Sequence, residues 1–298
     1  MGAAPGTALS RSDVGALNGA KDALLEWYAP RGRAYPWRRT RDPYRVLVSE
    51  VMLQQTQASR VVMPYRAFLR RFPSIRALAG APRRDVLVAW DGLGYNRRAV
   101  ALSEAARMLV REHGGTVPRD TAALQRLPGV GAYTAAAVAS IAFAEPVAAI
   151  DTNVRRIVSR ALLGEEAHAI APARVRELAD GWLDRDDPGA WNQALMDLGR
   201  EICRPHPRCE TCPLVYACRF ASTAATPRPA PRRQGAFEGS LRQVRGAVVR
   251  ALRARRSATV TEIADSTGSD VDRVAEAVER LAADGVVERH RGRVRLAS

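Results

Sequence analysis

The chain has 298 residues, of which 47% are hydrophobic and 26% are charged, and its formal net charge is +15. No stretch approaches the roughly 20 uncharged apolar residues of a membrane helix, so we expect no membrane-spanning helix. Residues 1–15 lack the basic and apolar regions of a signal peptide, so we expect a disordered N-terminus and a cytoplasmic, nucleoid-associated protein. Compositional bias explains why Lys21 is the only lysine, but the excess of 46 basic over 31 acidic residues favours a nucleic-acid partner.

Helical periodicity begins near Ala16 and continues to about Phe220, with apolar residues recurring every three or four positions. Proline and glycine residues separate the periodic segments. Convincing β-strand alternation is absent from this region, so we predict a mainly α fold. The predicted helical segments are 16–28, 45–69, 85–90, 97–111, 121–127, 132–142, 153–163, 171–183 and 190–202.

A linker rich in proline, alanine and arginine is predicted over residues 222–240, and a different unit follows over residues 241–298. Three helical segments precede two short strands that are joined by a turn at Arg291 and Gly292. This order is typical of a small winged-helix-like domain, which either contacts DNA or only packs against the rest of the protein. The expected helices are 241–256, 260–264 and 271–283, and the expected strands are 286–289 and 293–296.

Residues 127–131 form the string Leu-Pro-Gly-Val-Gly between two predicted helices. Glycines at both ends of a tight hairpin let the backbone turn sharply and approach a ligand closely. Amides of the hairpin and of the next helix N-terminus then provide a site for one DNA phosphate. A Gly-x-Gly turn alone is also compatible with a plain connector, whereas the full string is more specific.

Two carboxylates are candidates for chemistry. Asp151 precedes a predicted helix, so it is either an N-cap or a carboxylate that stabilises positive charge on a sugar during glycosidic cleavage. Glu50 falls in an otherwise apolar helix, where burial raises the pKa of a carboxyl group and suits it to general acid catalysis. The alternative for Glu50 is a surface ion pair with Arg38. The polar residues 54–57 that follow suit contacts to base edges.

All four cysteines lie in one short window with the pattern Cys-x5-Cys-x2-Cys-x5-Cys. Clustered cysteines in a chain with no expected export signal indicate a metal or cluster site rather than a disulfide framework. Four thiolates hold either a [4Fe-4S] cluster or a zinc ion, and zinc is the less favoured alternative because it prefers paired Cys-x2-Cys knuckles. The candidate ligands are Cys203, Cys209, Cys212 and Cys218.

Together these motifs resemble the endonuclease III and MutY superfamily of helix-hairpin-helix DNA glycosylases over about residues 20–220. The resemblance implies a glycosylase domain over residues 16–221, in which a six-helix barrel (36–145) packs against an iron–sulfur helical domain (16–35 with 146–221). The implied partner is double-stranded DNA with a mismatched or damaged base pair, from which one nucleotide is flipped into the enzyme. We expect a monomer.

Within the superfamily, residues 36–38 and 49–57 are most similar to MutY, the adenine glycosylase of base excision repair that acts opposite 8-oxoguanine or guanine. By that resemblance Glu50 protonates the leaving adenine, Asp151 stabilises the sugar cation and Asn153 orients the reacting groups. The implied base pocket comprises Tyr133, Arg33, Arg38, Leu53 and Asp197. The DNA-binding residues, including the helix-filling Gln55 and Tyr95, are Gln54, Gln55, Gln57, Tyr95, Leu127, Gly129, Val130 and Gly131.

Relatives that also cut the strand use a lysine two residues after the second hairpin glycine, where this chain has Tyr133. A phenol cannot form an imine, so we predict a monofunctional enzyme with little or no AP lyase activity.

The sequence departs from the MutY pattern in four ways: the first cysteine spacing is x5 rather than x6, Thr152 and Asn96 replace the usual residues, and no Nudix-like domain follows. Two alternatives therefore stay open: a thymine or uracil mismatch glycosylase of the same fold, and a non-catalytic DNA-binding protein.

Overall fold

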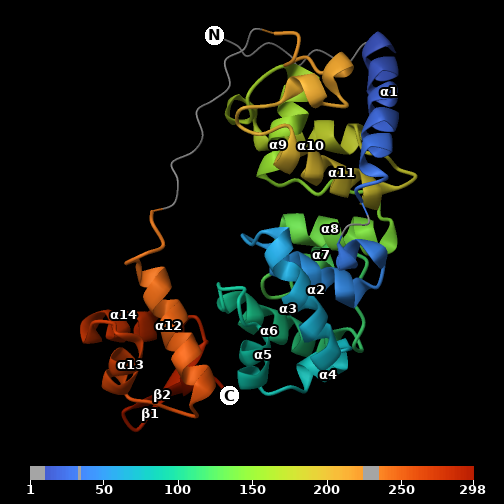
Figure 1. Ribbon diagram of the computed structural model, residues 1–298. Coiled ribbons are helices and arrows are strands. Elements are labelled where there is room, and N and C mark those ends of the chain that lie inside the picture. The colour runs from blue at the N-terminus through green and yellow to red at the C-terminus, as the bar shows by residue number, and fades with distance from the viewer. Residues whose placement is uncertain (1–10, 33–34, 224–234) are drawn as a thin grey trace, which may run out of the picture. The chain divides into compact units, whose positions relative to one another are not determined.

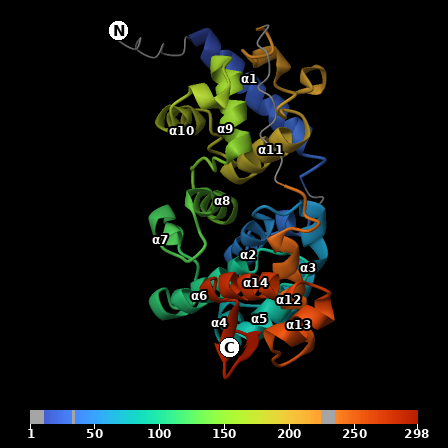
Figure 2. The same ribbon diagram turned by 90° about the vertical axis from the view of Figure 1, so that its left-hand side faces the viewer.

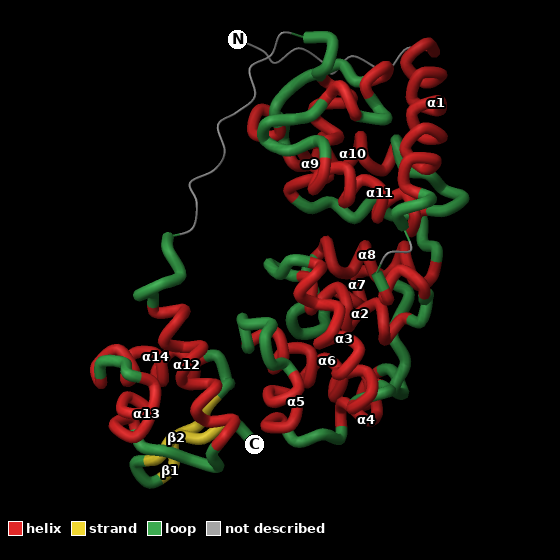
Figure 3. Tube along the Cα trace, viewed as in Figure 1, coloured by secondary structure: helices red, strands yellow, loops and turns green. Residues whose placement is uncertain are grey.

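The computed structural model describes residues 11–32, 35–223 and 235–298, and the chain divides into two compact units (Figure 1). The first unit combines residues 1–41 with 132–231, and the second combines residues 42–131 with 232–298. Helices dominate both units, and within the described ranges the single sheet is one β-hairpin (Figure 3). The predicted mainly α class is confirmed. None of the helices in these ranges is both long and apolar enough to span a bilayer.

The first unit is assembled from two separate stretches of the chain. Asp151 and Asp187 cap the N-termini of two of its helices by accepting backbone hydrogen bonds from Val154 and Ala190. The helix after Asp151 continues into a π-helical turn, which ends at Gly164 in the left-handed conformation. The elements of this unit are α1 (Arg11–Tyr28), the 3-10 turn Pro36–Arg39, α8 (Ala132–Phe143), α9 (Thr152–Val158), the π-helical turn Ser159–Leu163, α10 (Pro172–Gly181) and α11 (Pro188–Glu201).

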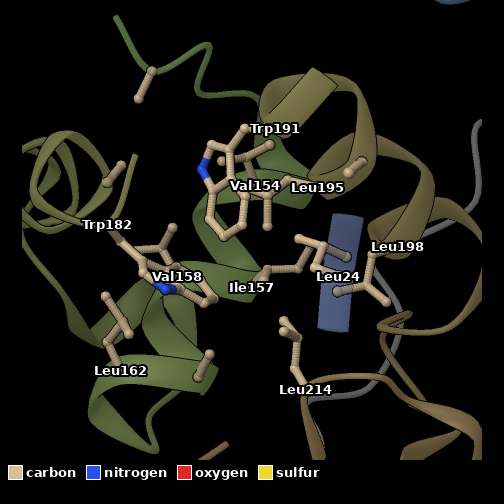
Figure 4. Packing of buried hydrophobic residues seen from close by; sticks show 14 of the residues in the cluster. Leu24, Val154, Ile157, Val158, Leu162, Trp182, Trp191, Leu195, Leu198 and Leu214 are labelled. Atoms are coloured by element: carbon tan, nitrogen blue, oxygen red, sulfur yellow. The ribbon is translucent and has the colours of Figure 1, made fainter. Parts of the chain in front are cut away.

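A continuous apolar core joins the helices of this unit (Figure 4). Trp182 and Trp191 meet edge to face with ring centroids 5.2 Å apart, and Leu24 of α1 is fully buried among the same residues. Leu214, which lies between the third and fourth cysteines, also packs into this core. The cysteine window is therefore anchored to the helical core by an apolar side chain as well as by its backbone.

The second unit begins with six short helices. Asp42, Ser74 and Asp120 cap three of them with side-chain oxygens. Phe68 and Trp90 meet edge to face at 5.9 Å in the core between them. These helices are α2 (Pro43–Leu53), α3 (Ala58–Arg71), α4 (Ile75–Ala79), α5 (Arg83–Ala89), α6 (Arg97–Glu112) and α7 (Thr121–Gln125).

Three boundaries differ from the predicted ones. The single segment predicted over residues 45–69 is broken into α2 and α3, because Gln55 adopts a positive φ of 54° in the turn between them. Helix α8, expected in the six-helix barrel, groups with the first unit, where a Cβ at Gly189 of α11 would stand 3.1 Å from the Cα of Ile141. Helix α1 begins at Arg11, inside the N-terminal segment predicted to be disordered.

The C-terminal part of the second unit has the predicted order of three helices followed by a hairpin. The three helices lie together in Figure 2. Thr259 and Glu262 form a reciprocal capping box at the start of the middle helix. The strands pair antiparallel, with Val287 opposite Leu296, and Ala258 adds a bridge to Val294. The elements are α12 (Leu241–Ala254), α13 (Val260–Thr267), α14 (Val271–Ala283), β1 (Val287–His290) and β2 (Arg293–Leu296).

The paired indoles of the first core provide a test of its contribution to stability. Trp191→Ala should lower the free energy of unfolding by about 3–5 kcal/mol, because it removes a large side chain that is 1% exposed. Urea unfolding followed by circular dichroism measures this change. Tyr216→Ala, which removes a fully exposed aromatic ring from the same unit, should leave stability nearly unchanged. Equal midpoints for the two variants would contradict this packing.

Candidate active site

The hairpin motif has the geometry that its glycines predict. Leu127 and Val130 are buried and anchor the hairpin, while the backbones of Gly129 and Gly131 are exposed. Gly129 has a φ of 78°, and a Cβ at this position would lie 2.8 Å from the Cβ of Ala101, so a larger residue would be both strained and crowded. The Gly129 carbonyl accepts a hydrogen bond of 3.2 Å from the Gln54 side chain.

Glu50 lies on α2 and is 5% exposed, surrounded on its helix by buried apolar residues. Its side chain is therefore inside the unit rather than on the surface, and Arg38, the partner in the alternative interpretation, is bound to Asp197. Leu53 is half-buried at the end of the same helix. In the following turn, Gln55 and Gln57 are exposed. The buried carboxyl group and the exposed polar turn are thus separated by about one helical turn.

A second turn, residues 91–96, carries Tyr95. This residue has a positive φ of 44° and is 44% exposed, although its side chain is large and aromatic. Gly92 and Gly94 also have positive φ, and the Gly94 carbonyl accepts a hydrogen bond of 3.1 Å from the Trp90 indole. The turn therefore displays an aromatic ring on a backbone that its neighbours hold in a rarely populated conformation.

Arg98, at the start of α6, ties these two turns together. Its guanidinium group lies over the rings of Trp90 and Tyr95, with centroid distances of 5.5 Å to each. Burial lowers the pKa of Arg98 to about 10, which leaves it charged at neutral pH. It contacts the carbonyl oxygens of Val51 (3.0 Å), Met52 (2.8 Å), Gln54 (2.5 Å), Leu93 (3.1 Å) and Gly94 (3.3 Å), and the hydroxyl of Thr56 (3.0 Å).

Arg38 and Asp197 form a buried, two-pronged ion pair in the first unit. The guanidinium nitrogens donate to the two carboxylate oxygens at 2.5 and 2.7 Å, and the side chains are 9% and 4% exposed. Burial by itself would lower the pKa of Arg38, but the hydrogen bonds and charge of Asp197 raise it above the ordinary value. The structure thus brings two predicted pocket residues together, whereas Arg33, a third, lies outside the described residues.

Asp151 is an N-cap, as one interpretation of its sequence context predicted, and it is also part of a longer network. One carboxylate oxygen accepts from the Val154 amide at 2.7 Å, and the other accepts from the Asn153 amide group at 2.8 Å. Asn153 in turn accepts from Arg156 at 2.9 Å. Arg156 also donates to the carbonyl of Cys203 at 2.8 Å. The aspartate is therefore connected to the first cysteine through two side chains.

Tyr133 lies near the start of α8, half-buried, and its hydroxyl donates to the sulfur of Met196 at 2.6 Å. Lys21, the single lysine of the chain, donates to the Leu183 carbonyl at 3.0 Å. Lys21 is therefore the one lysine amine that could form an imine, and it is hydrogen-bonded to the backbone between α10 and α11.

The four cysteines are all half-buried free thiols in the window after α11. Burial raises the pKa of Cys212 to about 12, and the charges of the other three cysteines act in the same direction. The thiols therefore lie near one another. In the part of the chain that the structure describes, no three potential ligand side chains gather closely enough to hold a single metal ion.

A second arginine, Arg160, holds the start of this window. It is 1% exposed, and its guanidinium group lies over the ring of Phe220 at 4.6 Å. It donates to the carbonyls of Arg204 (2.6 Å) and Pro205 (3.0 Å) and lies 3.7 Å from the Cys203 sulfur. Arg160 also forms a buried ion pair with Glu166 at 2.5 Å, so its guanidinium group links this carboxylate to the backbone at the start of the window.

Sequence reasoning missed Arg98, Arg156 and Arg160 as structural parts of the site. Each acts on backbone carbonyl groups that are distant in sequence, which no local motif reveals. One positional signal was available for Arg98. A positive charge in the first turn of a helix interacts unfavourably with the helix dipole, so an arginine there indicates a tertiary contact that compensates for it.

Comparison with known proteins places these features in a family context. Residues 48–183 match the HhH-GPD superfamily of base excision DNA repair proteins. The chain is 42% identical over 273 residues to an adenine DNA glycosylase of Mycobacterium tuberculosis, covering 89% of each protein. This coverage must include part of the C-terminal domain, because residues 241–298 exceed the uncovered share of the chain.

Two solved structures are similar to the chain. A thermostable thymine-DNA glycosylase superposes with a TM-score of 0.66 at 31% identity, covering 71% of this chain and 99% of that one. A trapped covalent intermediate of endonuclease III with DNA superposes with a TM-score of 0.60 at 24% identity, covering 72% and 98% of the two chains. The second likeness concerns the fold alone.

The Arg38–Asp197 pair provides a test of the site's energetics. Asp197→Asn should lower the free energy of unfolding by about 3–5 kcal/mol, because it leaves a buried guanidinium group without its counter-charge. Urea unfolding measures the loss, and the double substitution Arg38→Met with Asp197→Leu should recover part of it. Glu177→Gln, which breaks an exposed pair with Arg174, should change stability by less than about 1 kcal/mol. A wild-type midpoint for Asp197→Asn would contradict the buried pair.

Proposed function

Because the chain belongs to the HhH-GPD superfamily of base excision DNA repair proteins, and within it to the adenine DNA glycosylases, we propose that it removes adenine mispaired with 8-oxoguanine or guanine. The reaction is hydrolysis of the N-glycosidic bond. The observation that carries the proposal is the burial of Glu50, a carboxyl group inside the apolar helix α2, next to an exposed polar turn. The family context comes from the 42% identity to an adenine DNA glycosylase over most of both chains.

Glu50 acts in this proposal as the general acid. Adenine is a poor leaving group as an anion, and protonation of a ring nitrogen converts it into a neutral one. A carboxyl group that is 5% exposed is shielded from bulk water, so solvent does not compete with a base for its hydrogen bond. After base departure the resulting carboxylate assists the attacking water.

Asp151 stabilises the positive charge that develops on the deoxyribose. Its two oxygens each accept a hydrogen bond, from Val154 and Asn153, so the carboxylate is held in one orientation before the substrate arrives. Preorganisation of this kind avoids reorienting the charge during the reaction. N-capping and catalysis are therefore compatible roles, and Asn153 serves as the residue that positions the aspartate.

The buried Arg38–Asp197 pair is proposed to form part of the adenine pocket, together with Tyr133 of the same unit. A fixed guanidinium–carboxylate pair presents a defined arrangement of donors and acceptors, which suits the edge of one base.

Duplex DNA with a mismatched or damaged pair is the proposed partner. The exposed hairpin backbone at Gly129 and Gly131, followed by the first residues of α8, suits one phosphate. Gln55 and Tyr95, both exposed on turns with positive φ, suit the space left by a flipped nucleotide. We propose that the protein acts as a monomer in the cytoplasm.

A [4Fe-4S] cluster is the proposed cofactor of the cysteine window. Four neighbouring thiols beside a buried arginine fit a group that binds thiolates. When bound, such a cluster supplies structural cross-linking of the window rather than hydrolytic chemistry. Arg156 and Arg160 already fix the backbone of this window through the carbonyls of Cys203, Arg204 and Pro205.

A second candidate function is removal of thymine or uracil opposite guanine, which the likeness to a thymine-DNA glycosylase favours. The combination of Trp37-Arg38 and buried Glu50 favours adenine, since protonation helps a purine leave. The two candidates differ in the base released, which a direct assay resolves.

The test is a base-release assay on duplexes with adenine, thymine, uracil or hypoxanthine opposite guanine or 8-oxoguanine. We expect adenine release, with strands cut only after heat or alkali because Tyr133 replaces the lysine of strand-cutting relatives. Glu50→Gln should reduce the single-turnover rate by at least about 100-fold while duplex binding persists. Release of thymine or uracil alone would favour the second candidate, and rapid strand cutting without heat would contradict the monofunctional assignment.

The cofactor proposal has a separate test. The purified protein should show broad visible absorbance and about four irons per chain, as an iron–sulfur cluster requires. Cys212→Ser should bleach this absorbance, and Thr211→Ser, a neighbouring exposed change outside the ligand set, should retain it. A colourless protein with one zinc ion per chain would overturn the assignment.

A further inference from the structure

Within the second unit, two arginines that act in opposite directions fasten the C-terminal domain to helix α5. Arg84 of α5 donates to three carbonyls at the end of α12, those of Leu252 (3.2 Å), Arg253 (3.4 Å) and Arg255 (3.4 Å). Arg253 of α12 donates to the Leu87 carbonyl in the last turn of α5 at 2.9 Å. Each helix therefore has C-terminal carbonyls satisfied by an arginine of the other, where the helix dipole favours positive charge.

The same contact includes a close backbone approach. A Cβ at Gly285, which has a φ of 67°, would lie 3.6 Å from a methyl group of Val100 on α6. Arg253 itself is only 13% exposed, so it sits inside the contact rather than on its rim. The domain is thus held by a defined contact rather than by its linker alone.

Arg253 also reaches the turn that carries Tyr95. It forms an ion pair with Asp91, the first residue of that turn, and Asp91 is 70% exposed. The same carboxylate accepts a hydrogen bond from the Gly92 amide at 2.9 Å. Holding the Asp91 carboxylate therefore also holds the first amide of the turn. Arg98 binds the other side of the turn through the carbonyls of Leu93 and Gly94.

We propose that the C-terminal domain is a brace for the Tyr95 turn, and that Arg253 is a positioning residue that fixes this turn through Asp91 for entry into the opened duplex. The inference rests on the proposed function, because it assigns Tyr95 to the DNA. In this proposal the winged-helix-like domain has a role that does not require its third helix to contact DNA bases. That helix, α14, exposes four carboxylates beside its arginines, which disfavours insertion into a DNA groove: Asp270, Asp272, Glu276 and Glu279.

The experiment compares Arg253→Gln with Arg250→Gln in the full-length protein. Both variants lose one positive charge from α12. Arg250 is exposed and lies about one helical turn before Arg253, the residue that pairs with Asp91. Hydrogen exchange by mass spectrometry reports the amides of residues 91–96, and single-turnover base release from an adenine·8-oxoguanine duplex reports the reaction. Unstacking of 2-aminopurine at the target position, followed by fluorescence, reports the opening of the duplex.

We expect Arg253→Gln to speed exchange in residues 91–96 and to slow both unstacking and base release by about fivefold, which is the loss of roughly 1 kcal/mol from one ion pair. Arg250→Gln should match the wild type. Arg253→Lys should recover most of the rate, because it keeps a positive charge beside Asp91. If Arg253→Gln fails to fold, Asp91→Asn removes the negative partner of the same ion pair and should show the same defect.

Unchanged exchange in residues 91–96, or faster exchange with wild-type unstacking and base release, would overturn the brace. Failure of the proposed function is distinguishable, because the wild type would then release no base from any duplex. In that case the exchange comparison alone decides whether Arg253 fixes the turn.

Discussion

A buried guanidinium group needs hydrogen-bond acceptors for its terminal NH2 groups, and this need accounts for many contacts in the irregular parts of the molecule. Loops and helix ends have the carbonyl groups that regular structure leaves free, so they are the natural acceptors. Arg98 gathers the turns after α2 and before α6, and Arg156 and Arg160 gather the cysteine window. Arg253 fastens the C-terminal domain to α5 by the same means. The backbones of the candidate functional segments are therefore held by hydrogen bonds from buried arginine side chains. Regular backbone hydrogen bonding within a sheet or helix does not hold them.

The two kinds of buried arginine contact have different consequences. Arg38 is paired with the carboxylate of Asp197, which Arg200 also contacts at 3.1 Å, so its charge is neutralised within one local cluster. Arg98 instead binds neutral carbonyls from two turns, so it couples the positions of segments about 40 residues apart. Arg156 does the same for Asp151 and the first cysteine, with Asn153 between them. Arginines bound to carbonyl groups thus fix the relative positions of distant segments, whereas the ion pair fixes two side chains against each other.

Local patterns in the sequence were sufficient for the helices, the hairpin, the capping role of Asp151 and the burial of Glu50, because each depends on neighbours in the chain. The break at Gln55 was missed because the apolar helical pattern resumes after the polar residues 54–57, and the contact of Arg98 with the Gln54 carbonyl in this turn is tertiary. The grouping of α8 with α11 depends on a close approach at Gly189, which no periodicity encodes. The sequence likewise predicted a C-terminal domain but not its attachment, which rests on Arg84 and Arg253.

Gln55 and Tyr95 show why these tertiary contacts matter for the proposed chemistry. A non-glycine residue with positive φ costs on the order of 1 kcal/mol, so it persists only where its surroundings determine the backbone. Arg98 binds the carbonyl just before each residue, those of Gln54 and Gly94. A single cation therefore maintains both strained turns, and any shift of one turn changes the hydrogen bonding of the other. Two side chains suited to occupy an opened duplex are in this way held ready together before DNA binds.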